Sequence, residues 1–98
     1  MITTKQRAYL RSLSNNLQPV FQVGKGGLTP EIVSAIDSFL EANELIKITM
    51  LKNCELDVRE VASVVSERTH SDIVQVIGKK AVFYRQSKKK PVITLPKG

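Results

Sequence analysis

The chain has 98 residues, 42% of them hydrophobic, with 15 lysines and arginines against nine acidic residues. This length and composition predict one globular domain with a modest core, leave little room for a second domain and argue against a disordered chain. No apolar run approaches the roughly 18 to 20 residues that span a bilayer. The opening segment MITTKQRAYLRSL lacks the apolar centre of a signal peptide, and the lone Cys54 cannot form a disulfide within one chain. We therefore expect a cytoplasmic protein.

The net charge of +6 is distributed unevenly along the chain. Residues 1–27 and 79–98 contain basic residues and no acid, whereas all nine acids lie within residues 28–78. Two purely cationic ends predict a polyanionic partner, provided that the ends meet in space. The alternative interpretation is a basic protein with a charged tail.

The first predicted element is a helix that follows a capping box at Thr3 and Gln6 and extends to about Asn16. Leucines at helical spacing form its buried stripe, while the basic residues mostly fall off that stripe. The helix should therefore present a basic face that consists of Lys5, Arg7 and Arg11. The segment PVFQV then predicts a short strand.

The stretch GKGG, residues 24–27, separates this strand from a helix that Thr29 caps and Pro30 begins. A nucleotide-binding P-loop needs a longer spacing that ends in Lys-Ser or Lys-Thr, and the dinucleotide fingerprint G-x-G-x-x-G is absent. Two interpretations stay open. The stretch is either a plain turn or a G-x-x-G clamp, in which bare backbone N–H groups approach RNA phosphates and Lys25 adds a charge.

The helix after Pro30 has a broad apolar stripe, and the strand LIKITML that follows alternates apolar and polar residues. Asn53 is predicted to cap a third helix, with Glu55 and Asp57 in its first turn. We expect that helix to end near His70. Its buried side is expected to consist of Leu56, Val58, Val61, Ala62, Val64 and Val65.

The strand DIVQVIG, the turn Gly78-Lys79-Lys80 and the strand AVFYR form a predicted hairpin. The tail QSKKKPVITLPKG is expected to be mobile through Lys90, with VITL docking as an edge segment. The order αβαβαββ predicts an α/β fold. Strands linked by a helix should pair in parallel and the hairpin should pair antiparallel, so we expect a four-stranded mixed sheet.

The sequence offers little for catalysis or metal binding. No spacing nominates a nucleophile with its base, and no cysteine and histidine cluster could bind zinc. We expect no catalytic residue, metal or cofactor. Because aromatic residues make up 5% of the chain against 24% charged residues, we expect RNA to be recognised by shape and backbone rather than by sequence.

The chain resembles the YhbY-like bacterial proteins, which are stand-alone CRM domains (chloroplast RNA splicing and ribosome maturation). The resemblance covers nearly the entire chain and rests on TKQRAYLRSLSNNLQPVFQVGKGGLTPEI, ELIKITML and VQVIGKKAVFYRQS followed by ITLP. It implies an α/β fold similar to the C-terminal domain of translation initiation factor 3, with an extra N-terminal helix. It also implies association with precursors of the large ribosomal subunit. Plant relatives carry CRM domains in intron-splicing factors.

We therefore expect a non-enzymatic RNA-binding protein, with a CRM domain over residues 1–87 and a basic tail over residues 88–98. Its expected partner is ribosomal RNA in large-subunit precursors, without a membrane or a small-molecule substrate, and we expect a monomer. The alternative is a protein-interaction module that docks on ribosomal proteins through its acidic helices. The predicted RNA-binding residues are Gly24, Lys25, Gly26, Gly27, Lys5, Arg7, Arg11, Lys79, Lys80, Arg85, Lys88, Lys89 and Lys90.

Overall fold

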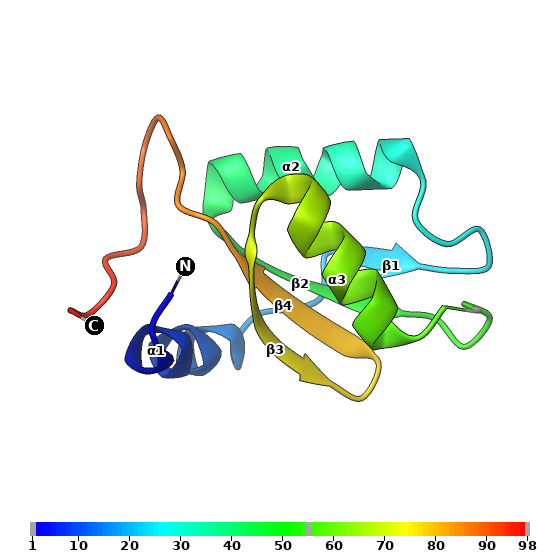
Figure 1. The fold of residues 1–98 in the computed structure, drawn as a ribbon, viewed down its shortest axis with the longest axis horizontal. Coiled ribbons are helices and arrows are strands. Elements are labelled where there is room, and N and C mark those ends of the chain that lie inside the picture. Colours follow the sequence, from blue (N-terminus) through cyan, green and yellow to red (C-terminus); the bar gives the residue numbers. More distant parts are fainter. Residues whose placement is uncertain (1, 55, 98) are drawn as a thin grey trace.

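The computed structural model describes residues 2–54 and 56–97. Helices α2 and α3 cover one face of a twisted sheet, and α1 crosses the opposite face at one end (Figure 1). We call that opposite face the α1 face. The predicted order αβαβαββ is confirmed. The elements are α1 (Thr4–Ser14), β1 (Phe21–Val23), α2 (Pro30–Asn43), β2 (Leu45–Met50), α3 (Val58–Thr69), β3 (Asp72–Ile77) and β4 (Lys80–Tyr84).

The sheet has four strands in the order β1-β2-β4-β3. β1 pairs in parallel with β2, and β4 pairs antiparallel with both β2 and β3. The predicted mixed sheet is therefore confirmed. Direct parallel pairing between β2 and β3 is wrong, because the closing hairpin inserts β4 between them. β2 and β3 still run in the same direction, as a helical crossover between them requires.

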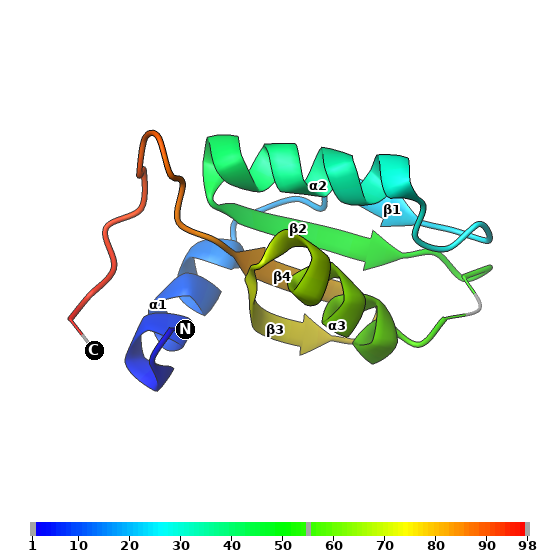
Figure 2. The ribbon, with the colours of Figure 1, turned by 45° about the horizontal axis from the view of Figure 1, so that its top comes forward.

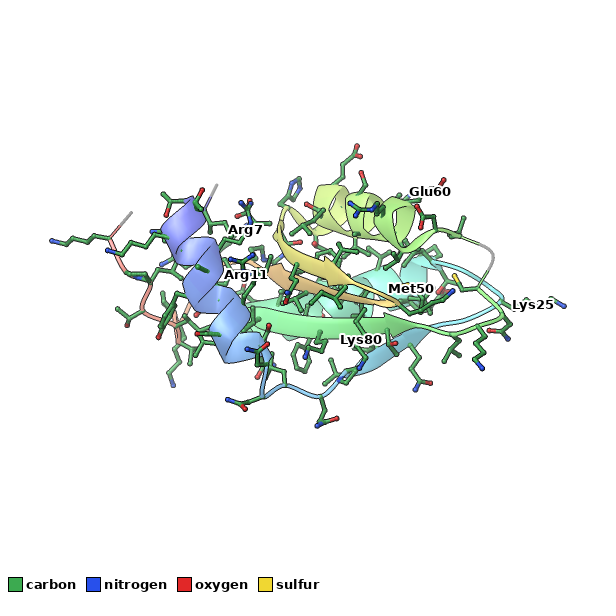
Figure 3. The ribbon with its side chains drawn as sticks, turned by 90° about the horizontal axis from the view of Figure 1, so that it is seen from below. Arg7, Arg11, Lys25, Met50, Glu60 and Lys80 are labelled. Atoms are coloured by element: carbon green, nitrogen blue, oxygen red, sulfur yellow. The ribbon has the colours of Figure 1, made fainter. Side chains whose placement is uncertain are left out.

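Two apolar clusters fill the two sides of the sheet. The larger lies beneath α2 and α3 and includes Phe83 and Ile36, both fully buried. The smaller lies beneath α1, where Leu10 packs with Val82 and Tyr84. Because α1 covers only one end of its face, the part of the sheet nearer the glycine loop stays open to solvent (Figure 3).

Local capping explains where the first two helices begin. Thr3 and Gln6 form both hydrogen bonds of the predicted capping box, at 3.0 and 3.1 Å. The Thr29 hydroxyl accepts a hydrogen bond from the Ile32 amide at 3.2 Å, and Pro30 follows at the first helical position. α1 ends at Ser14, slightly earlier than expected, with Asn15 as its C-cap.

The predicted start of α3 is wrong. Asn53 lies in a turn in which the Cys54 amide donates to the Leu51 carbonyl at 3.0 Å, and Asp57 takes the N-cap position. The predicted first-turn residue Glu55 lies outside the described residues. Leu56 precedes the helix and is 41% exposed, and Val64 is 36% exposed, so neither belongs to the buried side. The tight exit from β2 delays the helix by about one turn.

Carboxylates near the end of α2 hold the C-terminal segment. Glu44, the C-cap of α2, is fully buried, and its carboxylate accepts hydrogen bonds from the amides of Ser87, Val92 and Ile93. The Glu41 carboxylate accepts from the Lys88 amide at 3.0 Å. The VITL segment therefore docks through a buried carboxylate and apolar contacts rather than as a paired strand. The expected mobility through Lys90 and the domain boundary after residue 87 stay predictions.

Candidate nucleic-acid interface

The glycine loop lies at the opposite end of the longest axis from the C-terminal segment, and that axis measures 39 Å (Figure 1). The Gly27 amide donates to the Gly24 carbonyl at 2.9 Å and closes a four-residue turn. Lys25 and Gly26 occupy its corner, and both are exposed. The corner therefore presents a lysine and a bare stretch of backbone to solvent.

The three glycines of this turn differ in what requires them. A Cβ atom on Gly24 would lie 3.3 Å from Cδ1 of Leu51, so Gly24 allows close packing against the next loop. Gly27 has a φ of 66°, in the left-handed region that other residues avoid. Gly26 lies outside that region, and a Cβ atom there would meet nothing within 4 Å. The fold explains Gly24 and Gly27, but nothing within the described structure requires a glycine at position 26.

The loop after β2 lies beside the glycine loop (Figure 2), and the turn between β3 and β4 is bonded to the end of β2. The Leu51 amide donates to the Val23 carbonyl at 2.8 Å, and the Met50 amide donates to the Lys79 carbonyl at 2.7 Å. These bonds bring Lys52 and Lys79, both exposed, to the same end of the molecule as Lys25. Sequence reasoning missed Lys52 because it lies in the net acidic middle segment, and only its position after β2 could have indicated it.

Basic residues continue from this end along the α1 face. Lys80 projects from β4 on the uncovered part of the sheet, and Arg7 and Arg11 lie on the side of α1 nearest β3 (Figure 3). Arg7 is held there because its Nε donates to the Ile73 carbonyl at 3.3 Å. Lys47 of β2 lines the same uncovered region and was also missed by sequence reasoning. We define the basic surface as Lys25, Lys52, Lys79, Lys80, Lys47, Arg11 and Arg7.

Several predicted RNA-binding residues do not join this surface. The Arg85 side chain is 16% exposed, and its guanidinium forms an ion pair with Asp37 and donates to the Thr69 carbonyl. Arg85 therefore anchors α2 and the end of α3 to β4. Lys88, Lys89 and Lys90 follow β4 toward the end opposite the glycine loop (Figure 1). Lys5 is exposed near the start of α1 and is not part of the basic surface.

The two cationic ends of the chain meet, as the charge pattern required. The Gln6 side chain on α1 donates to the Pro96 carbonyl at 3.0 Å. Their meeting point lies away from the glycine loop, so a single continuous surface that includes Lys88–Lys90 is not formed. The basic residues that lie between the glycine loop and α1 come instead from the hairpin, at Lys79 and Lys80, and from β2, at Lys47. Five of the described acids lie on α2 and α3, across the sheet from the α1 face.

Within residues 2–54 and 56–97, no group of three or more histidine, cysteine or acidic residues could hold a metal ion. No helix in the described part of the chain is long and apolar enough to cross a membrane.

Comparison with known proteins places this geometry in a family context. Residues 2–85 match the model of the CRS1 / YhbY (CRM) domain family. The chain is 45% identical over 96 residues to the probable RNA-binding protein YqeI of Bacillus subtilis. This match covers 98% of this chain and 100% of that protein. It is 32% identical over 88 residues to the probable RNA-binding protein PA4753 of Pseudomonas aeruginosa, covering 90% and 85% of the two chains. The solution structure of the hypothetical protein SAV1595 from Staphylococcus aureus is similar, with a TM-score of 0.81, 49% identity and coverage of 98% and 100%.

Proposed function

This chain belongs to the CRS1 / YhbY (CRM) domain family, and on that premise we propose that it is a non-enzymatic RNA-binding protein. The relatives named above are called RNA-binding proteins, which supports RNA as the partner. The basic surface supports the same conclusion, since a face with many cations attracts a phosphate backbone. The acids on α2 and α3 would repel phosphate, so RNA binds on the α1 face.

The observation that carries the proposal is the glycine at position 26. A residue that neither the fold nor the packing restricts to glycine still lacks a side chain at an exposed corner beside Lys25. A missing Cβ lets a ligand approach the main chain closely, and exposed backbone N–H groups donate well to phosphate oxygens. We therefore assign the glycine loop to contact with the RNA backbone, with Lys25 as a cation beside the phosphate.

The proposed RNA is structured ribosomal RNA in precursors of the large ribosomal subunit, in the cytoplasm. The resemblance to YhbY-like proteins motivates this choice. The physical properties of the surface agree with structured RNA, because exposed aromatic side chains for stacking on single strands are scarce. Tyr84 is buried, and Tyr9 is 39% exposed on α1.

Replacing Gly26 with aspartate should weaken binding to a structured large-subunit RNA fragment at least tenfold. The new side chain blocks the backbone and adds a negative charge where a charged hydrogen bond worth about 1.5–3 kcal/mol would form. Because its Cβ meets open space, the variant should melt like the parent. Fluorescence anisotropy at fixed ionic strength measures the affinity, and circular dichroism checks the fold.

The matched control is Ser38→Asp, which adds the same charge at an exposed position on α2, on the opposite face. Its affinity should stay within about twofold of the parent, because exposed charges farther apart than about 10 Å are largely screened. Lys25→Ala should fall between the two variants. Gly27→Asp is a poorer test, since aspartate would be strained at a φ of 66°. Parent-like binding by both Gly26→Asp and Lys25→Ala would show that the loop does not touch RNA.

The second candidate function is docking on a basic ribosomal protein. The exposed acids of α2 and α3, including Glu31, Asp37, Glu60 and Glu67, favour it. Binding to purified RNA alone supports RNA recognition. Binding that requires a protein component and that persists after ribonuclease treatment supports docking on a ribosomal protein.

A further inference from the structure

A small pocket opens on the uncovered part of the α1 face, beside the C-terminus of α1. Its volume is about 150 Å³, well below the roughly 300–1,000 Å³ of pockets that take drug-sized ligands. The pocket therefore suits one small chemical group rather than a drug-sized molecule. It is lined by Asn15, Lys47, Gln75, Ile77, Lys80 and Val82.

Five of the lining residues belong to two rows that run across three strands. Lys47 of β2, Val82 of β4 and Gln75 of β3 are direct partners in one row. Thr49, Lys80 and Ile77 are direct partners in the next row. Because side chains of directly partnered residues lie about 5 Å apart on the same face, Lys80 lies close to Ile77 of β3, whereas Val82 of β4 separates Lys47 from Gln75.

An irregularity in β3 turns Gln75 toward this pocket. The pairing with β4 shifts register between Ile73 and Gln75. Val74 packs beneath α1, whereas Val76 packs beneath α2 and α3, so the two consecutive residues Val74 and Gln75 both face α1. Strict alternation would have turned Gln75 into the larger core instead. Bulges commonly re-aim side chains in this way next to functional sites.

The lining offers groups complementary to three parts of a nucleotide, which are the face of the base, the edge of the base and the phosphate. Ile77 is 60% exposed and offers apolar surface to the face of a ring, while Val82 is buried at the base of the pocket. The side-chain amides of Asn15 and Gln75 each supply donors and an acceptor, which suit the edge of a base. Lys47 and Lys80 supply the positive charge that a phosphate needs.

We propose that this pocket receives one unpaired nucleobase of the bound RNA, with a flanking phosphate between Lys47 and Lys80. This inference rests on the RNA binding proposed above and narrows the RNA to one that has a bulged or looped-out nucleotide. A base within a duplex could not enter, whereas an unstacked base can be splayed out and bonded along its edge. The composition had predicted that RNA is recognised by its shape and backbone. A base in this pocket adds recognition of one nucleotide to that.

The test compares two RNA hairpins that are identical except for one bulged nucleotide, prepared with each of the four bases. The parent should bind the preferred bulged hairpin at least about fivefold more tightly than the paired one, which is the scale of one net hydrogen bond. Gln75→Ala and Ile77→Ala should abolish this preference while their affinity for the paired hairpin stays near that of the parent. Gln86→Ala, at an exposed glutamine outside the pocket, is the matched control and should keep the preference.

Equal affinity of the parent for paired and bulged hairpins would overturn the pocket assignment and leave the proposed RNA binding intact. A preference that survives in Gln75→Ala would overturn it as well, and this variant decides the question alone if Ile77→Ala does not fold. Gly26→Asp should weaken both hairpins by the same factor and leave their ratio unchanged. If the parent binds neither hairpin, the proposed function itself fails.

Discussion

Raising the salt concentration from about 50 to about 200 mM should weaken RNA binding by roughly 100- to 500-fold. The reason is the release of counterions when lysine and arginine neutralise phosphates. If the basic surface neutralises about five phosphates, the logarithm of the affinity falls with the logarithm of salt with a slope between about −3.5 and −4.5. Affinity measured at four or more salt concentrations gives this slope directly.

Single replacements show which cations contribute to that slope. Lys47→Ala and Lys80→Ala should each make the slope shallower by slightly less than one, because each removes about one phosphate contact. Lys89→Ala is the control, since Lys89 lies toward the end opposite the glycine loop, beside Glu41. A slope near zero for the parent would contradict binding through the basic surface. A large change for Lys89→Ala would show that the C-terminal lysines also contact RNA.

Replacing Glu44 with glutamine should lower the free energy of unfolding by about 2–4 kcal/mol. One carboxylate oxygen accepts from the Ser87 amide at 2.6 Å, and the other accepts from the amides of Val92 and Ile93 at 2.7 and 2.6 Å. Glutamine offers only one acceptor, so its NH₂ group would face a buried amide donor. Hydrogen bonds to a charged group are worth about 1.5–3 kcal/mol each and do not add fully.

This loss corresponds to a drop in melting temperature of about 10–30 °C for a domain of this size. Thermal and urea denaturation followed by circular dichroism measure it. Glu67→Gln, at an exposed position on α3, is the control and should change the free energy of unfolding by less than about 0.5 kcal/mol. A Glu44→Gln variant as stable as the parent would mean that this carboxylate does not hold the C-terminal segment.

The pH dependence follows from the same site. Burial, the largest single influence, raises the pKa of Glu44, but the amide donors of Ile93, Ser87 and Val92 together outweigh it and hold the pKa below its ordinary value of 4.5. The pKa of Glu41 is also lowered, first of all by the Ser87 hydroxyl. Carboxylates with a lowered folded-state pKa stabilise the fold above pH 4.5 and lose that contribution as the pH falls through the folded-state pKa. The difference in the free energy of unfolding between the parent and Glu44→Gln should therefore become smaller below pH 4.5.

Features decided by neighbours along the chain could be predicted from the sequence. The caps at Thr3 and Thr29 bond to amides three residues away, so local pattern suffices to identify them. Apolar periodicity and β-forming residues likewise predicted the type of each helix and strand, and the turn at Gly78 predicted the hairpin. The start of α3 marks the limit of this reasoning. Asn53 was predicted as the cap, but the turn that leaves β2 moves the N-cap position to Asp57, whose side chain forms no capping hydrogen bond.

Features that depend on distant partners could not be predicted in the same way. Arg85 was predicted to bind RNA, but in the fold it forms an ion pair with Asp37, which lies 48 residues away in the chain. Lys47 and Lys52 were hidden in an acidic segment, because charge counted along the chain does not show which face a residue occupies. Glu44 gave no signal of its own, since its three amide partners lie more than 40 residues later.

The sequence by itself determined the elements, their order, the two cationic ends and the exposed glycine turn, because short-range hydrogen bonds and apolar periodicity encode these features. The tertiary structure alone decided that β4 lies between β2 and β3, that Gly26 is the one glycine of the turn that the fold does not require, and that a bulge turns Gln75 into a pocket. Each of these depends on strand register or on packing between segments far apart in the chain. The local rules do not decide them, because many tertiary arrangements of the same elements satisfy those rules.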